Sequence, residues 1–152
     1  MDEVRFVVPG EPTGKGRPQT KVMYNPNGFK DKKTGKVRNT MVNNVTPKKT
    51  VIYENLVKCT YHEQCQDFRF PDDAMLDMRI LAYYGIPKSK SKKIKEQMAK
   101  GLLRPTKKPD MDNVVKVIAD SLNTIAYRDD TQIVDCQCRK FYSENPRVEV
   151  IL

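Results

Sequence analysis

The segment KPDMDNVVKVIADSLNTI, residues 108–125, carries the strongest prediction of fold and chemistry in this chain. Its apolar residues recur at helical spacing, and at about 100° per residue they form one arc of a helix over 113–125. They are Val114, Val115, Ile118, Leu122 and Ile125. The polar residues Asp112, Asn113, Lys116, Asp120 and Asn123 collect on the opposite side. We therefore expect a helix that the core fixes and whose polar edge, starting at Asp112, is displayed.

Acidic residues flank this helix at both ends. Pro109 disfavours helix for the residue before it, and Asp112 is suited to cap the helix, so Asp110 lies in extended chain and is able to turn toward the same point. Asp129 and Asp130 follow the helix after a short connection. A helix of this length spans roughly 18–20 Å, so the chain has to double back for Asp130 to approach the first two acids. The sequence alone leaves that approach open.

Such a cluster of carboxylates has a chemical use. Magnesium prefers oxygen ligands, and ions held by two or three carboxylates generate a hydroxide and neutralise a phosphate in the transition state. Lys116, one turn from Asp112, is placed to stabilise charge on that phosphate. Ordinary structural roles remain open from the residues alone: Asp112 as a helix cap, and Asp129-Asp130 as a polar turn.

The positive charge of the chain is concentrated in two segments. The net charge is +9, yet residues 11–50 hold ten Lys and Arg against two acids, and residues 86–109 hold nine against one. The remainder of the chain is therefore acidic. This segregation favours a polyanion-binding surface around a group of carboxylates, with solvated lysine-rich loops as the alternative.

Length and composition indicate one intracellular domain. A chain of 152 residues, 38% of them hydrophobic, is long enough for one core and has no apolar run near the roughly 20 residues of a membrane helix. The N-terminus carries acids where a signal peptide carries basic residues. The cysteines lack the spacing of a structural zinc site, and we expect reduced, mostly buried thiols. They are Cys59, Cys65, Cys136 and Cys138.

The other elements are predicted from periodicity and turn residues. We expect strands at 4–8, 75–84, 131–142 and 148–152, a strand starting at Leu102-Leu103, a helix from 47 to about 66, a short basic helix between Ser91 and Gly101, and a long basic loop over 9–45. The first helix is expected to bury Ile52, Tyr53, Leu56 and Cys59. Strands and helices interleave without a regular βαβ period, which favours a single α+β domain over 1–152 with a mixed sheet packed with helices.

In these residues the chain resembles the RusA family of Holliday-junction resolvases, especially its phage and prophage members, over nearly its whole length. The matching motifs are Gly10-Glu11-Pro12-x-Gly14-Lys15-Gly16-Arg17-Pro18, Thr46-Pro47-Lys48-Lys49-Thr50, Pro87-Lys88-Ser89, Lys108-Pro109-Asp110-x-Asp112-Asn113-x-x-Lys116-x-x-x-Asp120-x-Leu122-Asn123, and Tyr127-x-Asp129-Asp130-x-Gln132-Ile133-Val134. The two acidic segments at this separation are the specific part of the match.

The resemblance implies a RusA-like homodimer that resolves four-way DNA junctions by paired, metal-dependent phosphodiester hydrolysis in DNA recombination and repair. The implied cofactor is Mg²⁺, with Mn²⁺ able to substitute, and the implied partner is branched DNA, without a membrane or a small-molecule cofactor. The implied location is the cytoplasm of a bacterial host, with a phage or prophage gene. The alternatives are a non-catalytic branched-DNA-binding or phage packaging-associated protein, and a less selective nuclease of flaps or forks.

The resemblance also assigns roles to residues. It implies Asp110, Asp112 and Asp130 as catalytic, metal-binding carboxylates and Lys116 as the catalytic lysine. Supporting positions are Asn113, Asp120 and Asp129. Phosphate contacts are expected from the matched N-terminal positions and from the second basic segment: Lys15, Arg17, Lys88, Lys92, Lys93, Lys95, Lys107 and Lys108.

Overall fold

Strands from both ends of the chain meet in one mixed sheet. The computed structural model describes residues 2–152 and orders this sheet β1-β6-β4-β5. The strands are β1 (Arg5–Pro9), β4 (Leu76–Gly85), β5 (Ile133–Ser143) and β6 (Arg147–Ile151). β6 runs antiparallel to both of its neighbours, whereas β4 and β5 are parallel. The predicted α+β class with a mixed sheet is confirmed.

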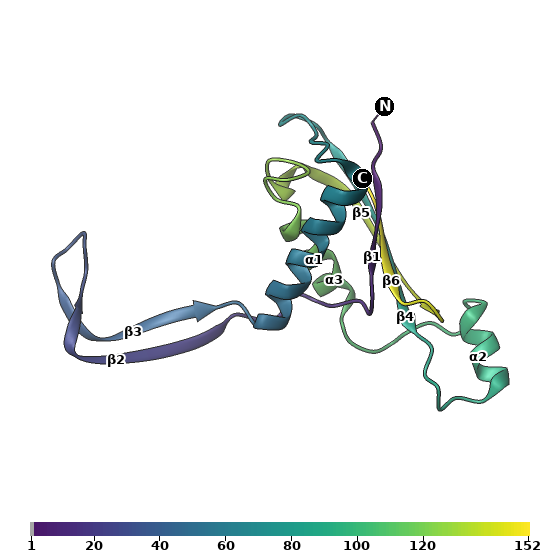
Figure 1. The fold of residues 1–152 in the computed structure, drawn as a ribbon, viewed down its shortest axis with the longest axis horizontal. Helices are drawn as coiled ribbons and strands as arrows, with labels where there is room; N and C mark the ends of the chain where they lie inside the picture. Colours follow the sequence, from purple (N-terminus) through teal and green to yellow (C-terminus); the bar gives the residue numbers. More distant parts are fainter. Residues whose placement is uncertain (1) are drawn as a thin grey trace.

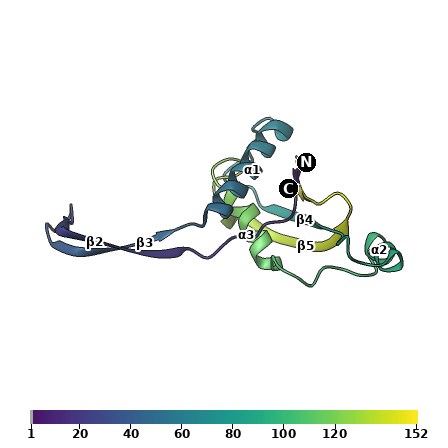
Figure 2. The ribbon, with the colours of Figure 1, turned by 60° about the horizontal axis from the view of Figure 1, so that its bottom comes forward.

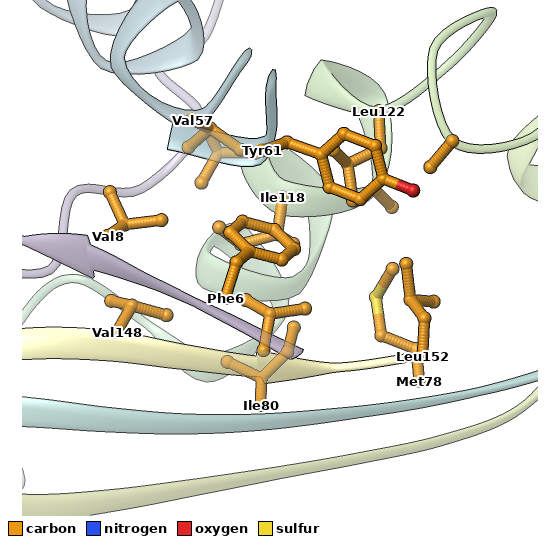
Figure 3. Packing of buried hydrophobic residues seen from close by; sticks show 14 of the residues in the cluster. Phe6, Val8, Val57, Tyr61, Met78, Ile80, Ile118, Leu122, Val148 and Leu152 are labelled. Carbon is orange, nitrogen blue, oxygen red and sulfur yellow. The ribbon is translucent and has the colours of Figure 1, made fainter. Parts of the chain in front are cut away.

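Two helices cover the same side of this sheet, α1 (Lys48–Cys65) and α3 (Met111–Ser121) (Figure 1). The alternation predicted for β4 is present, and its buried residues face these helices: Leu76, Met78, Ile80, Ala82 and Tyr84. Figure 3 shows Val57 and Tyr61 of α1, Ile118 of α3 and Leu122 directly after α3 packed over Phe6 and the strands. The ring of Phe6 meets that of Tyr61 edge to face at 5.3 Å. This core holds α3 in place.

The buried face of α1 agrees only in part with the predicted one. Tyr53 is buried and Leu56 packs partly buried against the core, as predicted, but Ile52 is 59% exposed and Cys59 is exposed. The buried residues of the helix are Thr50, Tyr53, Val57, Thr60 and Tyr61. The aromatic residues decide the face, because a stripe through Tyr53, Val57 and Tyr61 follows the four-residue helical spacing and buries two large rings. Cys136 is exposed as well, so the prediction of mostly buried thiols is wrong for it and for Cys59.

Residues 9–45, predicted as one long loop, contain a β-hairpin. Strands β2 (Gln19–Lys30) and β3 (Val37–Val45) pair antiparallel with each other and project away from the body (Figures 1 and 2). Their alternation is interrupted at Tyr24–Phe29 by a shift in register, so the sequence shows no clean period. The connecting turn is built around Asp31, whose carboxylate accepts the backbone N–H groups of Lys33 and Thr34.

Smaller differences concern the ends of elements. Ser91 caps α2 (Lys92–Ala99) through its hydroxyl, as predicted, and Gly101 follows at φ 77°. Leu102 and Leu103 are exposed and form no strand. α3 begins at Met111, so the N-cap position belongs to Asp110 and not to Asp112. Among the described residues, no helix has both the length and the apolar character to cross a membrane.

Candidate active site

The segment after β1 crosses the start of α3 and needs two glycines to do so. The Lys15 N–H donates to the Asn113 carbonyl at 3.0 Å, and a Cβ on Gly14 would lie 2.9 Å from the Cβ atoms of Asn113 and Pro109. The Gly16 N–H donates to Thr50 Oγ1 at 3.0 Å. These close approaches leave no room for a side chain. The segment therefore ties the beginnings of α1 and α3 together.

The chain that enters α3 is also tied to the sheet. The Tyr84 hydroxyl, at the end of β4, donates to the Pro109 carbonyl at 2.7 Å, directly before Asp110. The next residue, Gly85, donates its N–H to the carboxylate of Glu11 at 3.0 Å. Burial, with smaller contributions from nearby ionisable groups including Asp110, raises the pKa of Tyr84 to about 12, so this hydroxyl stays a donor at neutral pH. The position of Asp110 is therefore fixed by the core.

Three predicted catalytic residues lie at the start of α3. Asp112 and Lys116 are one turn apart on the helix, and Asp110 is its N-cap residue. All three are exposed, and Asp110 makes no capping bond with its side chain. Within residues 2–152, none of these three side chains forms a hydrogen bond or ion pair with the protein. Two carboxylates and an ammonium are thus available to a ligand over six residues, or roughly 9 Å of helix.

A basic hollow lies beside Asp110. It has a volume of about 720 Å³, and its lining includes Arg17, Lys49 and Lys108 together with the glycine segment 14–16. Lysine, arginine and backbone N–H groups are the usual contacts of phosphate in nucleic-acid complexes. The hollow therefore suits a phosphodiester backbone next to Asp110. It also places Arg17 and Lys108, two predicted phosphate contacts, at the site.

Asp130 lies elsewhere, at the far end of α3. It begins the short 3₁₀ helix η1 (Asp130–Gln132), and its N–H donates to Asn123 Oδ1 at 2.8 Å. Burial raises the pKa of its carboxyl, and so do the charges of Asp129 and Asp120 and a hydrogen bond with Asp120. Asp129, a predicted supporting residue, accepts the Thr131 N–H and caps η1.

The three predicted metal ligands are not brought together. Ten residues of helix, roughly 15 Å, separate Asp110 from Asp120, the neighbour of Asp130. In the described part of the chain, no group of three or more His, Cys, Asp or Glu side chains is placed to hold a metal ion. The structure thus places Asp110, Asp112 and Lys116 at the start of α3 and leaves Asp130 with Asp120.

Lys15 joins this second acidic group. Its ammonium lies 2.5 Å from Glu54 Oε1 and 3.3 Å from Asp120 Oδ2. Burial disfavours the charged form, but the two carboxylates outweigh it, and the net effect raises the pKa of Lys15. The expected contact of Lys15 with phosphate stays a prediction, since its ammonium is shared between carboxylates here. Glu54 was not predicted for the site, because the sequence did not identify the face of α1 that meets α3.

The remaining predicted phosphate contacts lie on and around α2. Lys92, Lys93 and Lys95 belong to this helix, Lys88 precedes it and Lys107 follows it. Lys92, Lys93, Lys88 and Lys107 are exposed, and Lys95 is partly buried. Only Met98 of this helix is buried, so α2 presents most of its surface to solvent.

The family model of the endodeoxyribonuclease RusA matches residues 9–152. The chain therefore belongs to the RusA family of endodeoxyribonucleases, enzymes that cut DNA internally. It is also similar to the uncharacterized protein YqaN of Bacillus subtilis strain 168, with 39% identity over 154 residues. That match covers 100% of this chain and 96% of the relative.

The environment of Asp130 predicts that the charged form of its carboxyl destabilises the fold. Because its pKa is raised above the ordinary 3.8, the charged carboxylate destabilises the fold once pH rises through the folded pKa, and does not do so below 3.8. In chelator, Asp130→Asn is therefore expected to melt higher than wild type at pH 7, with the difference shrinking toward pH 4. Thermal melts across this range test it. A lower melting temperature at pH 7 would contradict the prediction.

Proposed function

We propose that this endonuclease cuts branched DNA, four-way junctions above all, by metal-dependent hydrolysis at the start of α3. The observation that carries the proposal is the basic hollow lined by Asp110, with a second carboxylate, Asp112, in the first turn of α3. A protein that only binds DNA gains nothing from acids that face phosphates, because like charges repel.

The donor chemistry of this pair suits Mg²⁺ or Mn²⁺. Magnesium is commonly held by one or two carboxylates, with substrate phosphate oxygens and water completing its shell. Asp110 and Asp112 would hold the ion, which when bound supplies an activated water and neutralises phosphate charge. Asp130 is proposed as a third ligand on the family resemblance alone. It would have to leave Asp120 to join the pair.

The other residues of the site act on the DNA itself. Arg17 and Lys108 bind the backbone in the hollow and so bring the scissile phosphate to the start of α3. Lys116, one turn along the helix, donates from its ammonium to a phosphate oxygen or to the departing oxygen. Tyr84 and Gly14 keep Asp110 in place through Pro109. In a homodimer, two such sites would nick opposite strands of a two-fold symmetric junction, as recombination and repair require.

The test compares DNA structures with and without metal. The protein is incubated with an end-labelled four-way junction, a fork and a linear duplex of the same sequences, in Mg²⁺ and in chelator. We expect paired symmetric nicks in the junction with Mg²⁺ only, and junction binding in both conditions. Cleavage that survives chelation would remove the metal from the mechanism. Equal cutting of the linear duplex would instead remove the junction selectivity.

A further inference from the structure

The β2–β3 hairpin is an arm without a partner in the body. Every residue of β3 is exposed, and so are most residues of β2. Neither strand joins the four-stranded sheet. A two-stranded ribbon on its own is at best marginally stable in water, so an arm of this length gains from a surface to lie on.

The positive charge of the hairpin indicates that this surface is a polyanion. Its outer part, residues 30–38, holds Lys30, Lys32, Lys33, Lys36 and Arg38 against the single acid Asp31. The carboxylate of Asp31 is bound to backbone N–H groups of its own turn. A polyanion would therefore attract this tip.

The dimensions of the arm match duplex DNA. The nine residues of β3, at about 3.3 Å each, span at most roughly 30 Å, because the longer β2 loses reach at the register shift between Tyr24 and Phe29. One turn of B-DNA is about 34–36 Å, or 10–10.5 base pairs, and its major groove admits a two-stranded ribbon. The tip therefore stands a little less than one helical turn from the base of the arm.

The position of the hairpin is compatible with a DNA duplex that runs across the start of α3. In Figure 2 the hairpin and α2 lie at opposite ends of the molecule, with α3 between them. Both ends are basic, since α2 contributes Lys92, Lys93 and Lys95. A duplex bound at the start of α3 would meet positive charge in both directions.

We propose that hairpin 19–45 is a DNA-gripping arm, whose lysine tip binds phosphates of one junction arm about one helical turn from the cut. This inference rests on the proposed function of the site, and it adds a second point of contact on the DNA. Junction arms shorter than that reach would miss the tip. Affinity is therefore expected to depend on arm length, which is a property that contacts close to the cut cannot create.

The experiment varies arm length and tip charge together. Four-way junctions with 8-bp arms closed by loops and with 20-bp arms are titrated by fluorescence anisotropy in chelator, with wild type and with K32Q/K33Q/K36Q. Wild type is expected to bind the long-arm junction about tenfold tighter, and the variant to bind both alike. On the long-arm junction, the slope of log K against log salt concentration should be smaller in magnitude for the variant, by about 0.9 for each phosphate that the tip no longer neutralises. On short arms its affinity and its cleavage in Mg²⁺ should equal those of wild type.

The matched control removes the same charge at the other end. K92Q/K93Q/K95Q is expected to weaken binding yet to keep the preference for long arms. The proposal is overturned if the tip variant keeps the arm-length preference, or if it weakens both junctions equally. It is also overturned if light scattering shows that the tip variant dissociates a dimer, which would make the arm a subunit contact. The binding assay does not depend on cleavage. If wild type prefers long junction arms but cuts no junction in Mg²⁺, the DNA contact of the hairpin stands and the proposed function is rejected.

Discussion

Asp112→Asn is expected to lower the rate of junction cleavage in saturating Mg²⁺ by about 10³-fold or more, equivalent to ~4 kcal/mol of transition-state stabilisation. The amide keeps the size of the side chain but loses the charge that would hold the metal. Asp112 has no hydrogen bond or ion pair with the protein within residues 2–152, so the effect on folding should be small. Single-turnover cleavage of a labelled junction measures the change.

Binding separates the loss of a metal ligand from the loss of the fold. In chelator, Asp112→Asn should bind the junction as tightly as wild type or tighter, because one negative charge facing phosphate is gone. A small loss of stability is expected, since an acid in the first turn favours a helix by about 0.3–1 kcal/mol. Asp73→Asn, the same change at an exposed turn, is the matched control and should cut normally. Full activity of Asp112→Asn would reject the metal site.

Lys15→Met is expected to destabilise the protein by about 2 kcal/mol. Methionine keeps the apolar stem, but Glu54 and Asp120 lose their shared cation and Asp130 stands beside them. Removing one partner of a fully buried ion pair costs about 3–5 kcal/mol. The side chains of Lys15, Glu54 and Asp120 are 21%, 18% and 26% exposed, so solvent screens part of that cost. Urea midpoints at constant m-value measure the change.

The destabilisation of Lys15→Met should depend on charge and not on packing. Adding Glu54→Gln should restore part of the stability, because it removes one of the uncompensated carboxylates. Lys58→Met, on the same helix as Glu54, is the matched control and should stay within about 0.5 kcal/mol of wild type. No gain of stability on adding Glu54→Gln would point to poorer packing around the lysine stem instead.

Local sequence patterns predicted the elements that have a single buried face. The alternation of β4 was correct, and so was the arc of α3 through Val114 and Ile118, because a single buried face dictates each of them, although α3 ends at Ser121 before the predicted Ile125. The face of α1 was predicted only in part, because apolar residues lie on both sides of that helix and the packing of Tyr53 and Tyr61 chooses between them. The hairpin was missed because both of its faces are in solvent, where no burial imposes a period.

The site was predictable where it is contiguous in sequence. Helical spacing places Asp112 and Lys116 one turn apart on α3, and Asp110 lies directly before them as the N-cap residue. The position of Asp130 depends on how the turn after α3 folds, with Thr124 at φ 67° and Asn123 binding the Asp130 N–H. The Lys15 ion pairs join residues from three separate segments, and no local pattern reports such contacts.

The hairpin is attached to the body at one place, so it can be exchanged as a unit. Gln19 and Val45, its first and last residues, are register partners across the ribbon, so the arm leaves and rejoins the body at neighbouring points. Partners of this kind lie about 4.5–5.5 Å apart, a gap that a two-residue turn can close. The arm can therefore be shortened, lengthened or exchanged without altering the core or the start of α3. Substrate reach can diverge in this protein while its catalytic machinery stays the same.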